Sequence, residues 1–373
     1  MSNAFRELLK KVGSGVHTGK ALTREEATTA TRLMLTQEAT PAQIGAFMIA
    51  HRIKRPTSEE LAGMLDAYDQ LGPRLHPWEI NHGQDTSRSV SSSPSLGVTA
   101  LGTPYDGRSR TAPVTPLTAL VLATAGVPVV MDGGDCMPTK YGVPLIEIWQ
   151  GLGMDFSQLS VPQVQQVLEK TGLGFIYLPQ HFPEAHQLVS YRDQIGKRPP
   201  IATMELLWSA YRSADQRQTH HVAGYVHPPT ENLFKQTCQL RLVKNFTFVK
   251  GLEGSCDLAR DRTAIIAISE PSSSQGFERL LLHPSEYGLA GKDLPFESTT
   301  KLLTQYQEIL KGKSNPLMPA AIWNGGFYLW RCGVCPDLRA GLARAEYLFT
   351  SGNVDQKFNE IVDYLNKLQQ AEG

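Results

Sequence analysis

The chain has 373 residues, of which 41% are hydrophobic and 19% are charged. This composition is typical of a soluble globular protein with a large buried core. Its 36 lysine and arginine residues are balanced by 36 aspartate and glutamate residues, which argues against a mainly electrostatic nucleic-acid binder but leaves room for a local basic face. No apolar run approaches the roughly 20 residues that span a bilayer, and the first helix-like segment has no signal-peptide core. We therefore expect a cytoplasmic protein that makes no membrane contact.

The five cysteines are few and scattered, which argues against a disulfide framework. Cys332 and Cys335 form a lone CxxC pair. A redox role would require a thioredoxin-like context, and a zinc site would require two more ligands nearby. Neither is visible, so we interpret the pair as two half-buried thiols.

Residues 1–72 are predicted to form an all-helical domain. Thr23 with Glu26 has capping-box spacing, and Pro41 occupies a first helical position after Thr40. A further helix begins at Thr57 or Ser58. The helical domain is predicted to end at residue 72. It is followed by a polar segment, residues 73–97, that is rich in serine, proline and glycine. We expect this segment to be a hinge or linker, with anion binding through Arg88 and its serines as the alternative.

From residue 98 to 373 strand-like and helix-like segments alternate, which indicates an α/β domain with a central, mostly parallel sheet. Helices from about 180–215 are expected to join the small domain. The predicted strands are 96–101, 127–131, 175–178, 222–226, 245–249 and 263–267, and the predicted helices are 115–125, 144–152 and 160–172. Residues 297–312 and 319–366 are predicted to be helical regions.

A glycine loop, Gly102 to Gly107, directly follows the first predicted strand. Such a loop binds phosphate through backbone N–H groups. The ends of this loop have that character, but Pro104 has no N–H and Tyr105 is bulky. Arg108 and Arg110 follow at once and are candidates to bind phosphate in place of the missing amides.

Several segments resemble the anthranilate phosphoribosyltransferase family. These are residues 38–47 among the N-terminal helices, 124–130 at the second strand, 191–198 with two arginines, 249–254 before an acidic position, and 324–326. The resemblance covers nearly the whole chain. It implies a phosphoribosyltransferase that transfers phosphoribosyl from phosphoribosyl pyrophosphate to an aromatic amine such as anthranilate, with Mg²⁺, as a cytoplasmic homodimer in tryptophan biosynthesis.

The same resemblance implies roles for particular residues. Donor and phosphate binding would fall to Gly102, Thr103, Asp106, Gly107, Arg108, Arg110 and Thr115, acceptor binding to Arg192 and Arg198, and Mg²⁺ binding to Asp257 and Glu253. The active cleft would lie between the two lobes.

This sequence also departs from the family pattern. Two loop glycines are replaced by Pro104 and Tyr105, a basic turn becomes residues 131–135 with two aspartates, and an acidic metal pair becomes Cys256 and Asp257. The pattern is similar to a divergent branch that lacks the standard substrate motifs. It supports an alternative, a catalytically degenerate protein that binds nucleic acid or another phosphorylated ligand, with Tyr105 stacking on a base. A nucleoside phosphorylase-like activity is a third option.

Other clusters of polar residues have simpler interpretations. Asp132 and Asp135 are either metal ligands or ordinary Asp-Gly turn residues. His220 and His221 lie near the predicted strand 222–226, and adjacent residues on a strand point to opposite faces. We interpret them, with His227, as core or edge histidines.

Overall fold

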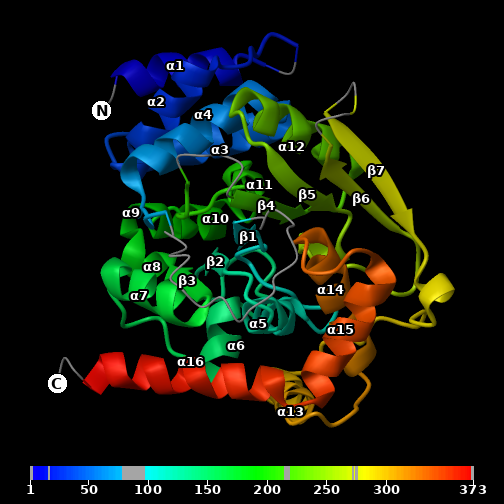
Figure 1. The fold of residues 1–373 in the computed structure, drawn as a ribbon. Helices are drawn as coiled ribbons and strands as arrows, with labels where there is room; N and C mark the ends of the chain where they lie inside the picture. Colours follow the sequence, from blue (N-terminus) through cyan, green and yellow to red (C-terminus); the bar gives the residue numbers. More distant parts are fainter. Residues whose placement is uncertain are drawn as a thin grey trace.

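The computed structural model describes residues 3–15, 17–77, 97–213, 219–270, 273 and 276–370. A small lobe of helices lies above one edge of a larger α/β lobe (Figure 1). The prediction of a helical domain and an α/β domain with a mostly parallel sheet is confirmed. Most of the segment 73–97, including Arg88 and its serines, lies outside the described residues. Within the described residues no helix combines the length and the apolar character that crossing a membrane requires.

Four helices build the N-terminal part of the small lobe. Thr23, Thr40 and Thr57 each form a capping box with the residue three positions later, so the orphan N–H groups at these helix starts are satisfied locally. Pro41 is the first helical residue after Thr40, as predicted. The helices are α1 (Asn3–Gly13), α2 (Arg24–Leu35), α3 (Pro41–Lys54) and α4 (Ser58–Leu71).

A seven-stranded sheet forms the centre of the large lobe, in the order β3-β2-β1-β4-β5-β6-β7. The first five strands pair in parallel, and β6 and β7 add an antiparallel edge. The parallel strands are buried along nearly their whole length, because helices cover the sheet. The strands are β1 (Val98–Leu101), β2 (Val129–Gly133), β3 (Leu173–Tyr177), β4 (Thr219–Gly224), β5 (Asn245–Val249), β6 (Ala264–Ser269) and β7 (Phe277–Leu282).

Beneath the sheet, α5 packs against α14 and α16, and α16 also contacts α7. Helices α14 and α15 approach each other closely at Gly326. A Cβ at this position would lie 2.6 Å from the Cα of Leu342, so only glycine fits there. The α-helices that follow the N-terminal four are α5 (Thr115–Thr124), α6 (Leu145–Gly151), α7 (Val161–Thr171), α8 (Leu178–His181), α9 (Pro183–His186), α10 (Val189–Ile195), α11 (Ile201–Met204), α12 (Pro228–Leu240), α13 (Thr299–Leu310), α14 (Met318–Arg331), α15 (Leu338–Thr350) and α16 (Asn353–Gln370).

Two elements were not predicted. Helix α12 starts on Pro228, and a proline at the first helical position is compatible with a helix because its missing N–H would be unbonded there anyway. Strand β7 is an edge strand with a mixed exposure pattern, which gives a weak alternating signal. Strand β4 also begins three residues before its predicted start, so that it includes both His220 and His221.

The two lobes are joined by a cluster of charges between α4 and the end of α12. Arg241 pairs with both Asp66 and Asp69 of α4, Arg24 lies 2.5 Å from Asp66, and Arg212 lies 2.6 Å from Asp69. Helices α10 and α11 pack against α3 and α4, respectively. These contacts hold the helical lobe at a defined position over the sheet.

We expect Arg241→Ala to lower the free energy of unfolding by about 2 kcal/mol. Its two carboxylate partners are only partly exposed, so the loss should lie between that of a surface pair and that of a buried pair. Urea unfolding measures the change. Arg262→Ala is the control, because Arg262 and its partner Asp261 are both exposed, and equal losses in the two variants would contradict this role for Arg241.

Candidate functional site

The glycine loop after β1 is a tight turn that follows the strand directly. A Cβ on Gly102 would lie 2.1 Å from the carbonyl oxygen of Leu206, and one on Gly107 would lie 2.3 Å from that of Val143. Gly107 also has a positive φ of 69°. Both positions therefore require glycine for reasons of packing and backbone conformation, independently of any ligand.

Tyr105, in the middle of the loop, points into the protein. Its side chain is 4% exposed, and its hydroxyl donates a hydrogen bond to the carboxylate of Asp132 on β2. The prediction that Tyr105 stacks on a base is wrong in this conformation, because a ring buried on this partner has no accessible face. Burial raises the pKa of Asp132 to about 8 even though the Tyr105 hydroxyl lowers it.

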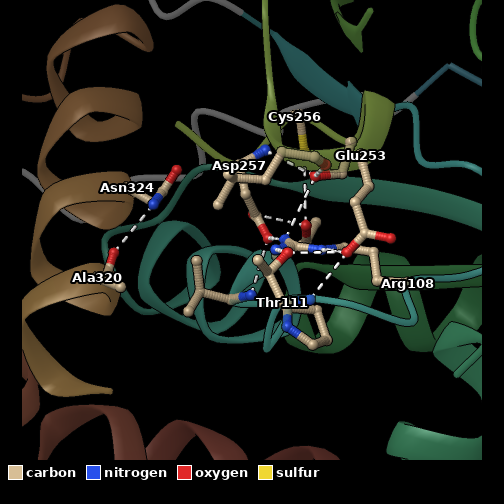
Figure 2. A network of polar contacts seen from close by, with 12 residues as sticks. Arg108, Thr111, Glu253, Cys256, Asp257, Ala320 and Asn324 are labelled. Carbon is tan, nitrogen blue, oxygen red and sulfur yellow. Dashed lines mark hydrogen bonds and ion pairs between the residues drawn. The ribbon is translucent and has the colours of Figure 1, made fainter. Parts of the chain in front are cut away.

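Arg108 is the buried centre of a polar network beside the loop (Figure 2). Its guanidinium pairs with the carboxylate of Asp257 and donates to Thr111. Asp257 also accepts hydrogen bonds from the Val114 N–H at 2.9 Å and the Thr115 hydroxyl at 2.7 Å. The Arg108 and Asp257 side chains are 3% and 1% exposed, so their opposite charges neutralise each other inside the protein and do not face solvent.

The carboxylate of Glu253 lies against a set of hydrogen-bond donors on the segment that follows the loop. It accepts hydrogen bonds from the backbone N–H groups of Ser109, Arg110 and Thr111 at 3.2, 3.1 and 2.9 Å and from the Thr111 hydroxyl at 2.9 Å. The Lys140 ammonium lies 3.0 Å away. Burial alone would raise the pKa of Glu253, but Lys140 and the N–H donors lower it to about 2, so the group is ionised at neutral pH.

The space directly behind the loop is very small. Thr103, Gly107, Arg108 and Thr115 line a cavity of about 20 Å³. A single water molecule needs at least 10–15 Å³ on this measure. Four of the predicted donor-binding residues therefore face a space that holds about one water molecule.

A large open cleft lies on the other side of Pro104. Two adjoining cavities of about 1070 and 550 Å³ share Arg52, Thr203 and His227, and together form one cleft between α3 and the α/β lobe. Residues 196–200 and the turn that contains Glu253 also line it. Of the predicted site residues, Arg198 and Glu253 line this cleft.

The wall of the cleft carries positive charge. Arg52, Arg55 and Lys197 are exposed, and Arg198 is part-buried with its Nε 3.0 Å from an Asp106 carboxylate oxygen. Glu253 is the only carboxylate among the cleft-lining residues in the described part of the chain, and its charge is already neutralised by Lys140. The cleft is thus a surface that favours anions.

The two predicted acceptor arginines have different environments. Arg192 is 2% exposed, pairs with buried Glu205 and donates to the sulfur of Met137 at 3.1 Å. Arg198 lines the open cleft. Arg110, a predicted phosphate ligand, has a side chain that is 76% exposed and lies 3.6 Å from Glu253. Only Arg198 and Arg110 are therefore accessible to a ligand without rearrangement.

The residues predicted to bind Mg²⁺ do not suit a metal ion in this arrangement. Both carboxylate oxygens of Asp257 accept bonds from protein donors, and so do both oxygens of Glu253. A cation would have to displace the Arg108 guanidinium from Asp257, and Mg²⁺ requires free oxygen ligands. Across the described ranges, no group of three or more His, Cys, Asp or Glu side chains is placed to hold a metal ion.

The interpretation of the histidines and cysteines is confirmed only in part, because His227 is exposed and lines the cleft and Cys332 is buried and not half-buried. His220 is buried and its Nε2 lies 2.8 Å from the Thr247 hydroxyl, while its Nδ1 faces the Cys332 sulfur at 3.7 Å. Cys332 is buried and Cys335 is part-buried, and both are free thiols. Burial lowers the pKa of His220 to about 3 and raises that of Cys332 to about 11, so this pair is neutral and unreactive.

Sequence reasoning missed three cations of the cleft, Arg52, Arg55 and Lys197. They come from α3, its end and the α10–α11 connection, which are far apart in sequence. The available signal was weak, because Arg52 to Arg55 form a short basic run at the end of a predicted helix, where cations are common in any case.

The chain matches one family of known proteins along most of its length. Residues 6–72 match the model of a glycosyl transferase family helical bundle domain, and residues 98–354 match the α/β domain of the same family. The anthranilate phosphoribosyltransferase of Acetivibrio thermocellus is 26% identical over 362 residues, which is 96% of this chain and 97% of that protein. That of Methylobacterium nodulans is 26% identical over 370 residues, 98% and 99% of the two chains.

Solved structures show the same fold. The anthranilate phosphoribosyltransferase of Saccharomyces cerevisiae in complex with PRPP and Mg superposes with a TM-score of 0.78 at 14% identity, covering 97% of this chain and 98% of that one. The enzyme of Thermus thermophilus superposes with a TM-score of 0.74 at 20% identity, covering 98% and 100%. At these identities the match establishes the architecture.

Proposed function

Because the chain belongs to the glycosyl transferase family that joins a helical bundle to an α/β domain, we propose that it acts through the cleft between its two lobes and binds single-stranded nucleic acid there. The observation that carries this proposal is the cationic wall of the cleft, with Arg52, Arg55, Lys197 and Arg198 along it. Phosphate groups of a strand are attracted to such a groove without regard to sequence.

The size of the cleft favours an extended ligand. A pocket for a small molecule holds about 300–1000 Å³, and the two joined cavities exceed this range together. Prolines 56, 104, 199, 200, 228 and 229 line the walls, which makes them stiff. Exposed Ile53 and Val226 add apolar surface, so the cleft offers both phosphate contacts and contacts to sugar or base faces.

Binding of a fluorescent single strand, followed by anisotropy at several salt concentrations, tests the proposal. With three exposed cations on the wall, a plot of the logarithm of the association constant against the logarithm of the salt concentration should have a slope of about −2. The double variant with Arg52→Ala and Lys197→Ala should bind more weakly. The magnitude of its slope should be smaller by roughly 1.4, because two phosphate-binding cations are lost. Lys311→Ala with Lys313→Ala, two exposed lysines after α13, is the control. Equal binding by both double variants, or no binding by the natural chain, would overturn it.

Phosphoribosyl transfer to an aromatic amine is the second candidate function. It is favoured by family membership over nearly the whole chain and by relatives named anthranilate phosphoribosyltransferase. In this candidate the donor would bind at Gly102, Thr103, Asp106, Gly107, Arg108, Arg110 and Thr115, Mg²⁺ at Asp257 and Glu253, and the acceptor at Arg192 and Arg198, in a homodimer. The loop would first have to open, because its donors and carboxylates are bonded to each other.

Calorimetric titration with phosphoribosyl pyrophosphate, with and without Mg²⁺, separates the two candidates. We expect no Mg²⁺-dependent binding, because Arg108 holds Asp257 and the space behind the loop accommodates about one water molecule. Micromolar binding that requires Mg²⁺ would instead support the transferase and show that the loop opens.

A further inference from the structure

The carboxylate of Glu253 is an anion bound by the protein itself. Three consecutive backbone N–H groups, from Ser109 to Thr111, point at its two oxygens, and the Thr111 hydroxyl adds a fourth donor. Consecutive N–H groups that converge in this way are a recurrent binding site for phosphate and other oxyanions. Here a side chain supplies the oxyanion.

The donors around Glu253 carry more positive charge than one carboxylate requires. Lys140 Nζ, Arg110 Nε and Arg108 Nε lie 3.0, 3.6 and 3.7 Å from its oxygens. Asp257 offsets Arg108, which leaves Lys140 and Arg110 against a single negative charge on Glu253. A phosphate group, with a charge between one and two negative units, would match these two cations better.

The backbone of Glu253 is held in an unfavourable conformation. Its φ is 56°, in the left-handed region that a glutamate rarely adopts. The conformation turns the carboxylate toward the donors of 109–111. Because such a conformation is unfavourable for a residue with a side chain, the contacts of the carboxylate hold it in place, and their loss would free the turn.

The site is next to the open cleft. Glu253 and Gly254 line the 550 Å³ part of that cleft together with Lys197 and Arg198. A phosphate group that enters the cleft therefore reaches the outer side of this carboxylate without crossing the protein core.

We infer that the N–H groups of 109–111, with Thr111, Lys140 and Arg110, form a phosphate site that Glu253 keeps closed. The site binds a phosphate monoester or inorganic phosphate once the carboxylate swings out or is removed. This inference rests on the proposed function for its physiological ligand, a phosphorylated molecule in the cleft, and it makes Glu253 the regulator of that cleft.

Inorganic phosphate and pyrophosphate, titrated calorimetrically into the full chain, test the inference. Glu253→Ala should bind either anion at least about tenfold more tightly than the natural chain, because the donors lose their internal partner. Glu253→Asn should show the same gain, since asparagine tolerates the left-handed backbone and has no charge. Glu286→Ala, which removes an exposed glutamate outside the cleft, should leave binding unchanged.

A second change identifies the site itself. Adding Lys140→Ala to Glu253→Asn should abolish most of the gain, because Lys140 supplies the nearest cation. Circular dichroism melting verifies that each variant is folded. Unchanged phosphate binding in folded Glu253→Asn would overturn the inference, as would a gain that survives the loss of Lys140.

The outcome is independent of the nucleic-acid experiment. If the natural chain binds a single strand but Glu253→Asn gains no phosphate affinity, the closed phosphate site is wrong and the cleft proposal stands. If Glu253→Asn gains phosphate affinity but no variant binds a strand, the site stands and the nucleic-acid proposal is wrong.

Discussion

Replacing Arg108 by alanine should lower the free energy of unfolding by about 3–5 kcal/mol, which is the cost of removing one partner from a buried ion pair. The Arg108 and Asp257 side chains are 3% and 1% exposed. Without the guanidinium, the Asp257 carboxylate keeps the Val114 N–H and the Thr115 hydroxyl as its partners among the described residues. Chemical denaturation in urea, with a two-state fit, measures the change.

Two further variants separate this structural role from a ligand-binding role. Arg110→Ala should change the free energy of unfolding by less than about 1 kcal/mol, because its side chain is 76% exposed. Arg108→Ala combined with Asp257→Asn should recover part of the loss, since no unpaired buried charge remains. If Arg108→Ala is as stable as the natural chain, Arg108 is not locked by Asp257 and becomes available to phosphate.

The buried pair of Tyr105 and Asp132 should make stability fall as the pH rises. The ordinary pKa of an aspartate, 3.8, applies to the unfolded chain, and burial raises the folded value to about 8. Between these values the folded chain holds a proton that the unfolded chain has released, so stability decreases with rising pH and levels off above the folded pKa. The repulsion from Glu205 acts in the same direction as burial.

Asp132→Asn should remove this dependence. The amide oxygen can still accept the Tyr105 hydrogen bond, but the side chain has no proton to lose. Relative to the variant, the natural chain should therefore lose on the order of 3 kcal/mol of stability between pH 5 and pH 8. Urea unfolding of both chains across this range measures it. Parallel stability profiles would mean that Asp132 ionises normally in the folded chain.

Local signals in the sequence were enough to predict much of the fold. The capping boxes at Thr23, Thr40 and Thr57 are made by residues within one turn of each other, so their geometry depends on the local chain alone. Strand β5 matches its predicted limits at both ends, because residues 246–249 are all aromatic or β-branched, which are the residue types that favour strands. Helix α12 and strand β7 escaped prediction, since prolines and an edge position weaken the usual patterns.

The site was less accessible to prediction. The sequence identifies the glycine loop, the arginines after it and the acidic turn, and it shows that the loop departs from a phosphate-binding pattern. It does not indicate that Arg108 pairs with Asp257 or that Glu253 binds the N–H groups of 109–111. These partners are more than 140 positions apart.

The sequence by itself therefore determined the two-lobed α/β architecture, the position of the loop and its chemical alteration, because helix caps, hydrophobic patterns and glycine turns are local properties. Only the tertiary structure decided which charges are available to a ligand. Folding brings Arg108, Asp257 and Glu253 together and buries them, while it leaves Arg52, Arg55 and Lys197 exposed along one cleft. Whether a charge is neutralised inside the protein or faces solvent depends on contacts between distant segments, and a linear sequence does not specify these contacts directly.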